Sequence, residues 1–305
     1  MLTFSKDFFQ GETRDDFYIE PMMKCVWAAQ LEVLTVVEQI CRQNGLRYFA
    51  DWGTLLGAVR HKGYIPWDDD LDICMLREDY NRFAAVAEKG LPGEYQAVSL
   101  NTFPDWDQVF LRVVNACTVS YDEERLRQFH GCPYMVGIDI FPLDVIPEQP
   151  QTENYHTELF STVYSSARLY PKEPSEVEEI LPDLEDLCGT SFNRSGNLQN
   201  QLLRAADAIA QTCGSSGSRL LTHLADHAVK KHFLRKEWYE ECVYLPFEGF
   251  RMPAPAEYDS VLQELFGDYM TPVRYAAGHD YPFYKKQQEL YEQSLSASEI
   301  RPFLP

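Results

Sequence analysis

The segment WDDDLDI at residues 67–73 holds the densest group of side chains that could do chemistry. If the chain becomes a strand near Asp70, the two-residue period of a strand places Asp70 and Asp72 on the same face. Two neighbouring carboxylates repel each other and lose hydration on burial, so such a pair persists at low cost only where a cation bridges it. Oxygen ligands at this spacing suit Mg²⁺ or Mn²⁺. The alternative is a solvated acidic turn, because acidic doublets are common on acidic surfaces.

Two further features lie before and after this segment. Upstream, Gly53 and Thr54 follow an expected strand and open a short helix, where free backbone N–H groups could hold a phosphate. Downstream, Asp139 is the lone carboxylate of the apolar segment 137–141. A carboxylate flanked by isoleucines is costly unless it has a partner. A cation shared with the two acids of the first segment would be one partner, and the alternative is a backbone group or an arginine such as Arg112.

The residues around these three features resemble those of the LicD family of bacterial phosphocholine transferases, which has the fukutin-type phospho-polyol transferases as distant relatives. The resemblance is carried by DWGTLLGAVRHKGYIPWDDDLDI at 51–73, GIDIFPLD at 137–144 and FEGFRMPAPAEYDSVLQELFGDYMTP at 247–272. It implies the nucleotidyltransferase fold, in which Gly-Ser/Thr is followed by a pair of acids and then by a third acid on a neighbouring strand. The helical stretch between the second and third segments is not diagnostic.

The resemblance implies transfer of phosphocholine, or of a related phospho-alcohol, from a CDP-alcohol such as CDP-choline. The acceptor would be a hydroxyl of a cell-surface glycan, such as a teichoic acid or a lipopolysaccharide, or of its lipid-linked precursor, and CMP would be released. Asp70, Asp72 and Asp139 are then the expected catalytic residues and the shared ligands of Mg²⁺ or Mn²⁺. A divalent ion is needed because an acidic protein repels the closely spaced charges of a diphosphate.

The same resemblance assigns the nucleotide-binding residues. Gly53 and Thr54 would bring backbone and hydroxyl donors to the phosphates, and Arg60 and Lys62, from the basic island 60–62, would clamp the diphosphate. The alternative for the island is ordinary helix-end charge that faces a C-terminal dipole. A quaternary ammonium is usually held by aromatic faces. The aromatic candidates, of which none is assigned, are Trp52, Tyr64, Trp67 and Trp106.

The elements that position these residues are expected from the spacing of apolar side chains. Recurrence every three to four residues predicts a helix over 20–44 that ends at Gly45, and alternation predicts a strand over 46–51. The other elements expected in the front half are a short helix over 53–63, a strand over 71–76, a helix over 78–89, two short strands in 108–121 that turn near Asn115, and a strand over 134–141.

Beyond residue 150 the pattern becomes helical, with a late β element. Helices are expected over 155–169, 177–187, 198–212 and 220–231, followed by a hairpin over 243–255 and a helix over 258–266. We therefore expect an α+β fold in two parts. Residues 1–150 would form a nucleotidyltransferase-like catalytic core, a mixed β-sheet flanked by helices. Residues 151–305 would form a mainly helical region whose late hairpin returns to the core.

The composition excludes several classes of partner. The chain has 27 Lys and Arg against 47 Asp and Glu, a formal net charge of −20, and such a field repels nucleic acid and anionic membrane surfaces. There is no run of about eighteen apolar residues, so we expect no membrane span. Eight scattered cysteines without a CxxC pair, and an acidic N-terminus without a signal-peptide core, favour a cytoplasmic protein.

Other readings of the chemistry compete with the phosphotransferase. A nucleotide-sugar glycosyltransferase also uses an Asp-x-Asp pair with Mn²⁺, but it normally places a whole nucleotide-binding βαβ half before the pair, where this chain has one helix and one strand. A non-catalytic scaffold with this fold would not need the three acids and the Gly-Thr pair, which are all present. His223 and His227 have a zinc-binding spacing, but no glutamate follows the first as HExxH requires, so a surface helix is favoured.

Overall fold

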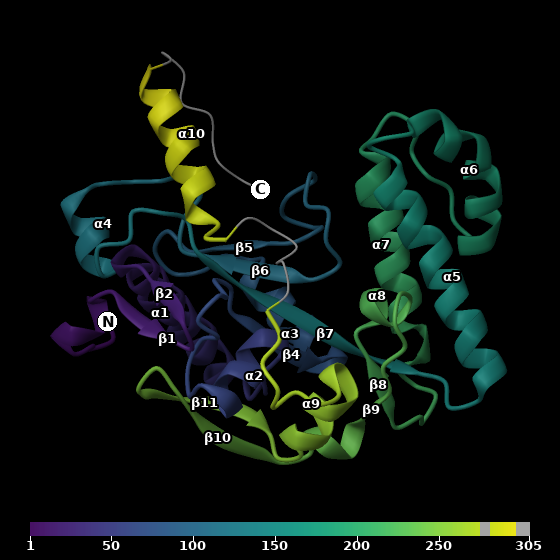
Figure 1. Cartoon of the computed structure of the whole chain (residues 1–305). Coiled ribbons are helices and arrows are strands. Elements are labelled where there is room, and N and C mark those ends of the chain that lie inside the picture. The colour runs from purple at the N-terminus through teal and green to yellow at the C-terminus, as the bar shows by residue number, and fades with distance from the viewer. Residues whose placement is uncertain (275–280, 297–305) are drawn as a thin grey trace.

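The computed structural model describes residues 1–274 and 281–296 (Figure 1). At its centre lies a mixed sheet in the order β3-β4-β7-β6-β5, and β8 and β9 extend it beside the second half of β7. In this sheet β4 and β7 run parallel, and the other neighbouring pairs are antiparallel. The strands are β3 (Phe49–Ala50), β4 (Asp72–Leu76), β5 (Gln96–Val98), β6 (Leu111–Val114), β7 (Gly137–Ile146), β8 (Leu220–Thr222) and β9 (Leu234–Arg235).

The front half packs its helices and the sheet around one hydrophobic core. Its helices are α1 (Pro21–Asn44), α2 (Trp52–Arg60), α3 (Arg77–Ala87) and α4 (Glu123–Gln128). The buried stripe of α1 includes Met23 and Trp27, at the predicted spacing. They share the core with Ile73 of β4 and Ile140 of β7. Gly45 ends α1 in the left-handed conformation, with φ of 61°, and the α+β fold class is confirmed.

Three expected strands differ from the structure. The strand over 46–51 is reduced to β3, and of the two strands in 108–121 only β6 forms, with β5 as its antiparallel partner. The strand over 134–141 begins later and runs through Pro142 to Ile146. The Asp139 N–H points to β4, so alternation turns the nitrogen of Pro142 to the opposite side, into the gap between β6 and β8. The missing proline donor therefore breaks no ladder bond.

The helical region packs around a second hydrophobic core, to the right of the sheet in Figure 1. The helices α5 (Pro150–Leu169), α6 (Pro174–Cys188) and α7 (Leu198–Ala210) bury Phe160, Val177 and Leu202 against one another. The expected helix over 220–231 is wrong, because the chain forms β8, the four-residue helix α8 (Leu224–His227) and then β9. The backbone of β8 pairs with the end of β7 at Asp144–Ile146, and this tertiary pairing overrides a helical spacing of apolar residues.

The late hairpin and the helix after it are confirmed. β10 (Cys242–Phe247) and β11 (Phe250–Pro255) pair in antiparallel fashion and pack beside β3 and α2 (Figure 1), and α9 (Tyr258–Phe266) has the expected ends. The sequence patterns do not predict α10 (Tyr284–Ser296), which lies above β5 and β6 in Figure 1. They also do not predict the hairpin of β1 (Glu12–Arg14) and β2 (Phe17–Ile19). Short 3-10 helices are η1 (Lys6–Phe9), η2 (Gln211–Cys213) and η3 (Lys236–Tyr239).

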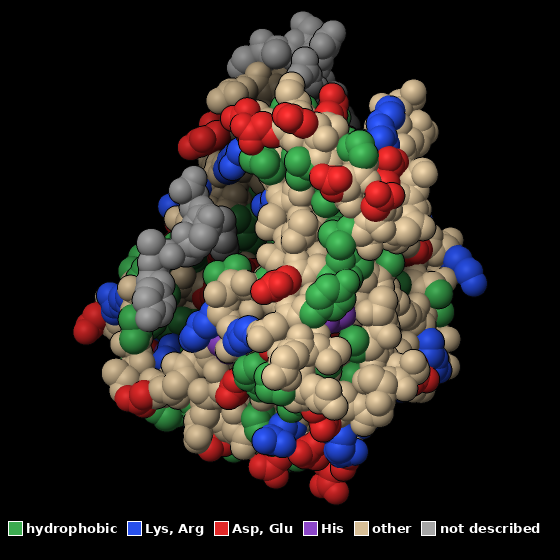
Figure 2. Space-filling model, turned by 90° about the vertical axis from the view of Figure 1, so that its right-hand side faces the viewer, with side chains coloured by type: hydrophobic (Ala, Val, Ile, Leu, Met, Phe, Trp, Pro, Cys, Tyr) green, Lys and Arg blue, Asp and Glu red, His purple; other side chains and the backbone are tan. Residues whose placement is uncertain are grey.

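The surface carries much of the negative charge of the chain. On the face seen from the helical region, acidic side chains gather at the upper and lower ends, with hydrophobic side chains between them (Figure 2). Among the described residues, no helix combines the length and the apolar character that crossing a bilayer requires. All eight cysteines are free.

Candidate active site

Asp72 and Asp139 lie side by side on the two parallel strands of the sheet. Asp72 is the first residue of β4 and the register partner of Asp139 in β7, and partners in a parallel ladder extend their side chains from the same face. Both residues are only 8% exposed. Asp70 lies two positions before β4 and lines the same cavity as Asp139. The fold therefore brings together the three acids that the sequence singles out.

The acids of this group repel one another. Burial raises the pKa of Asp72 well above its ordinary value, and the negative charges of Asp70 and Asp139 raise it further. Burial and the charge of Asp70 likewise raise the pKa of Asp68, on the same loop. The group thus holds more negative charge than its own cations neutralise, a condition that a bound divalent cation relieves.

Arg112 neutralises part of this charge. It is the antiparallel register partner of Asp139 on β6, and it donates two hydrogen bonds to the Asp139 carboxylate, from Nε to Oδ1 and from Nη2 to Oδ2, the second at 2.7 Å. The Trp106 ring lies 5.3 Å from the guanidinium carbon, and Trp106 Nε1 donates to the Phe110 carbonyl at 2.8 Å. Arg112, one of the two kinds of partner that the sequence allows for Asp139, is therefore its partner in the structure.

The carboxylates fit a divalent cation in their chemistry but do not form a closed metal centre. Within the described residues, no group of three His, Cys, Asp or Glu side chains is arranged to hold a metal ion. Asp70 and Asp72 offer hard oxygen ligands, whereas both oxygens of Asp139 already accept hydrogen bonds from Arg112. Mg²⁺ commonly takes one or two protein carboxylates and completes its shell with water and substrate phosphates. An open site of this kind suits it.

The start of α2 lies directly against the acid loop. The Thr54 hydroxyl accepts a hydrogen bond from the Asp72 N–H at 2.8 Å, which holds β4 against α2. A Cβ added to Gly53 would lie 2.5 Å from an oxygen of the Asp68 carboxylate, so glycine alone fits here without a shift of its neighbour. Trp52, directly before it, has a left-handed φ of 40°. The first N–H groups of a helix have no partner within it, so donors for a phosphate lie beside the carboxylates.

Arg60 and Lys62 have their contacts elsewhere. The Nη1 of Arg60 donates to the Tyr269 carbonyl at 3.0 Å. Lys62 is exposed, and its carbonyl accepts from the Glu248 N–H at 2.9 Å. These hydrogen bonds tie Arg60 and Lys62 to the late part of the chain, and His61 lies 3.1 Å from Asp15, so the basic island is not bonded to the carboxylates of β4 and β7.

A cavity of about 620 Å³ opens beside the carboxylates. Asp70, Asp139 and Arg112 line it, together with apolar side chains of β5 and β6 such as Val98 and Val114. Cavities of roughly 300–1,000 Å³ with a few convergent polar groups are typical of small-molecule sites. The acids therefore lie where a bound ligand could reach them.

The helix α10 supplies one wall of this cavity, in part through Lys286 and Gln287. The Gln287 amide bonds both backbone groups of Met135, at 2.9 Å each. Before the helix, the Phe283 N–H donates to Asp69 Oδ2 at 2.6 Å. The C-terminal helix is thus held both to the segment that precedes β7 and to the acid loop. It carries no motif that sequence reasoning could have used.

The four aromatic candidates for an ammonium site already have partners against their rings. These partners are His223 for Trp52, Trp27 for Tyr64, Arg274 for Trp67 and Arg112 for Trp106. Of the four, Trp106 lines the cavity. They therefore do not form an aromatic cage around a common point.

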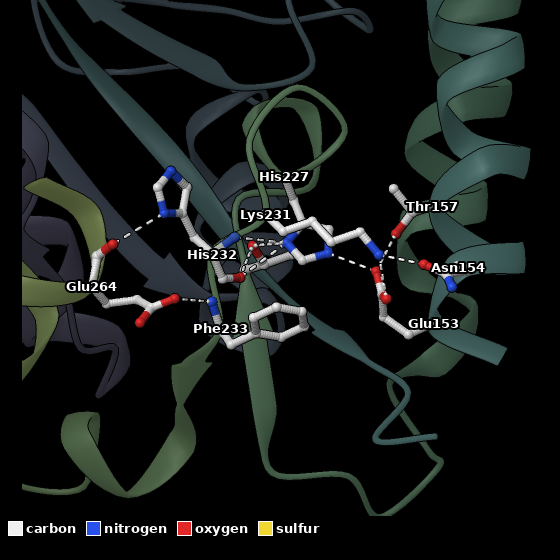
Figure 3. Close-up of polar contacts among 9 residues, drawn as sticks. Glu153, Asn154, Thr157, His227, Lys231, His232, Phe233 and Glu264 are labelled. Atoms are coloured by element: carbon white, nitrogen blue, oxygen red, sulfur yellow. Dashed lines mark hydrogen bonds and ion pairs between the residues drawn. The ribbon is translucent and has the colours of Figure 1, made fainter. Parts of the chain in front are cut away.

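His223 and His227 are buried, so the expected surface helix is wrong. His223 Nε2 lies 2.8 Å from Oδ2 of Asp51, the residue before α2. His227 Nε2 lies 2.8 Å from Glu153 Oε1 on α5, and its Nδ1 accepts from the His232 N–H at 3.1 Å (Figure 3). Both histidines therefore join the β8–β9 segment to neighbouring elements, one toward the front half and one toward α5.

The comparisons with known proteins agree with this geometry. Residues 45–166 match the family model described as LicD/FKTN/FKRP, nucleotidyltransferase domain. The chain is 26% identical over 251 residues to the lipopolysaccharide cholinephosphotransferase LicD of Haemophilus influenzae, a match that covers 79% of this chain and 88% of that protein. It is 40% identical over 55 residues to the ribitol 5-phosphate transferase FKRP of Homo sapiens, or 18% of this chain and 11% of that protein. The matched domain holds all three acids, whereas α10 lies outside it.

Proposed function

Because the chain is a phosphotransferase of the LicD family, we propose that it transfers phosphocholine from CDP-choline to a hydroxyl of a cell-surface glycan or of its lipid-linked precursor, with release of CMP. The long match is to a lipopolysaccharide cholinephosphotransferase, while the match to a ribitol 5-phosphate transferase spans 55 residues. Choline is therefore preferred to ribitol, glycerol or ethanolamine as the carried alcohol.

One observation carries the proposal. Asp72 and Asp139 lie side by side on the same face of two parallel strands, and Asp70 and Asp139 line a cavity of small-molecule size. A purely structural role would not need a surplus of buried negative charge. Chemistry at a diphosphate does, because the diphosphate and a metal ion must be held together, and the family match favours an alcohol over water as the acceptor.

In the proposed reaction, an oxygen of the acceptor hydroxyl bonds to the phosphorus that carries choline, the bond from that phosphorus to CMP breaks, and CMP leaves with the electron pair. Asp139 orients the hydroxyl and accepts its proton. Asp70 and Asp72, with Asp139, would hold Mg²⁺ or Mn²⁺, which supplies charge neutralisation at the diphosphate when bound. Gly53 and Thr54 donate to the phosphate oxygens from the start of α2.

Two rivals are less well supported. A nucleotide-sugar glycosyltransferase does not account for a LicD-type domain that spans every acid of the site. A non-catalytic scaffold does not account for a cavity that Asp70 and Asp139 line. We place the enzyme in the cytoplasm, which the free state of its eight cysteines supports. We further propose that residues 1–150 form the catalytic part and that residues 151–305 shape the acceptor side.

The test is release of CMP from CDP-choline in the presence of Mg²⁺ and a glycan acceptor, compared with CDP-ribitol, CDP-glycerol and CDP-ethanolamine. We expect turnover with CDP-choline and its loss in Asp70→Asn, Asp72→Asn and Asp139→Asn. Asp183→Asn is the matched control, because Asp183 is exposed on α6. Turnover that survives the loss of Asp72 would refute the metal assignment. Turnover with another CDP-alcohol alone would correct the carried group.

A further inference from the structure

Arg112 has hydrogen-bond donors left over. An arginine carries five N–H donors in a rigid planar fork. Asp139 takes one donor from Nε and one from Nη2. Of the other three, one on Nη1 and one on Nη2 lie along the outer edge, and the third, also on Nη1, points back toward Cδ; within the described residues no hydrogen bond uses Nη1. An outer edge of this kind has the paired-donor geometry that matches two oxygens of a phosphate.

The guanidinium group is fixed in place on its other sides. Asp139 holds the inner edge, and the ring of Trp106 lies against the group. Trp106 is itself held by its hydrogen bond to the Phe110 carbonyl and is 5% exposed. A cation that is already oriented loses little conformational freedom when it binds an anion.

The group also faces the place where a ligand would sit. Arg112 lines the cavity, and its side chain is 31% exposed, compared with 11% for the carboxylate that it pairs with. The cavity is lined by Asp69, Asp70 and Asp139 as well, so an anion entering it needs a cation at the point of contact. The basic island at 60–62, from which the sequence predicts that cation, makes its hydrogen bonds elsewhere.

We propose that Arg112 is a catalytic residue that binds the diphosphate of the donor through its outer edge, and that Trp106 is its positioning residue. The inference rests on the proposed function for the identity of that anion, and it assigns a role to a strand residue outside the motifs. As the bond from phosphorus to CMP breaks, negative charge grows on the departing phosphate, and the guanidinium group donates hydrogen bonds to oxygens that carry this charge.

The experiment measures the dissociation constants of inorganic diphosphate and of CMP by titration calorimetry, with and without Mg²⁺, at constant ionic strength. The variants are Arg112→Gln and Arg112→Lys. We expect diphosphate to bind about tenfold more weakly to Arg112→Gln, which corresponds to about 1.4 kcal/mol. Arg112→Lys keeps a cation beside Asp139 but lacks the planar fork, so it should fold like the wild type and bind with intermediate affinity.

The chain offers a matched control. Arg77 also makes a two-bond ion pair with a carboxylate of β7, from Nε and Nη2 to Asp144 at 2.6 and 2.8 Å. It does not line the cavity. Arg77→Lys, like Arg112→Lys, keeps a cation beside its carboxylate and should fold, while its affinity for diphosphate changes by less than about twofold.

The positioning role of Trp106 has its own readout. Trp106→Phe keeps a ring against the guanidinium group and should keep most of the affinity for diphosphate, whereas Trp106→Leu should lose it. A general loss of stability would not separate these two variants in this way, because both reduce the volume of the same buried side chain.

Unchanged affinity for diphosphate in both Arg112 variants, or the absence of saturable binding by the wild type under either condition, would overturn the inference. Binding of inorganic diphosphate does not require a CDP-alcohol. Arg112-dependent binding in a protein that releases no CMP from any CDP-alcohol would therefore refute the proposed function and leave the anion site standing. If the protein turns over CDP-choline but its affinity for diphosphate does not depend on Arg112, the proposed function stands and the anion site is refuted.

Discussion

The buried ion pair between His223 and Asp51 predicts a large and pH-dependent contribution to stability. Asp51 is fully buried and His223 is 5% exposed, and their charged groups lie 2.8 Å apart, outside good hydrogen-bond alignment. Removal of one partner of a buried pair costs about 3–5 kcal/mol, because the other charge stays buried without compensation. His223→Leu should lower the free energy of unfolding by about that amount at acidic pH.

The sign of the pH dependence follows from the charges around the imidazole. Burial lowers the pKa of His223, but the negative charge of Asp51, with smaller contributions from Asp226 and Asp144, raises it above its ordinary value of 6.5 overall. Arg77 pairs with Asp144 in the same region. The folded protein therefore binds this proton more tightly than the unfolded chain does. The stabilisation is complete below the unfolded pKa and is lost as pH rises through the folded pKa.

Urea unfolding of the wild type, His223→Leu and Asp51→Asn at about pH 5.5 and about pH 9 tests this reasoning. We expect the difference in free energy of unfolding between the wild type and His223→Leu to be smaller at the higher pH. His156→Leu is the control for the loss of a buried imidazole, because His156 is also buried but bonds a backbone carbonyl, that of Ile209, and not a carboxylate. A difference of less than about 1 kcal/mol between the wild type and His223→Leu at the lower pH would refute a stabilising pair.

Three further changes test the site and its surroundings. Asp72→Asn should abolish CMP release yet raise the free energy of unfolding in urea without metal, because it removes one charge from a group of mutually repelling acids; a loss of stability would contradict that account. Gly53→Ala puts a Cβ 2.5 Å from a carboxylate oxygen of the acid loop, so it should cost about 1–3 kcal/mol and lower kcat, whereas Gly214→Ala, where the nearest atom is 3.4 Å away, should do neither. Gln287→Leu removes both hydrogen bonds to Met135, so proteolysis within α10 should become faster and KM for CDP-choline should rise; equal proteolysis rates would show that other contacts hold the helix.

Local patterns predicted the elements whose stability is mainly local. The apolar stripe and the left-handed Gly45 account for α1, and the two-residue turn at Glu248 and Gly249, both with positive φ, accounts for the hairpin of β10 and β11. The helix expected over 220–231 failed for the opposite reason, because β8 exists only where the end of β7 offers it an edge. That edge belongs to a strand far away in the chain, and no window of sequence around Leu220 contains it.

The candidate site divides in the same way. Asp70, Asp72 and Asp139 could be picked out because carboxylates next to apolar strand residues are costly, and Gly53 and Thr54 because a helix start follows a strand. Among the partners of Asp139, the sequence leaves a metal ion and an arginine open, and the fold adds the arginine. The fold also places α10 along one side of the cavity. Arg60 and Lys62 form their hydrogen bonds with Tyr269 and Glu248, not with the acids of β4 and β7.

The order of residues alone therefore identifies which groups could do the chemistry and where most of the helices form, since charge, burial preference and helical period are properties of short segments. Which groups meet is set by the folded chain. The parallel register of β4 on β7 places Asp72 beside Asp139, the antiparallel register of β6 places Arg112 on its other side, and the bonds of Gln287 bring α10 over the cavity. A shift of either register by one residue would turn these side chains to the opposite face of the sheet, and nothing within a single strand specifies that choice.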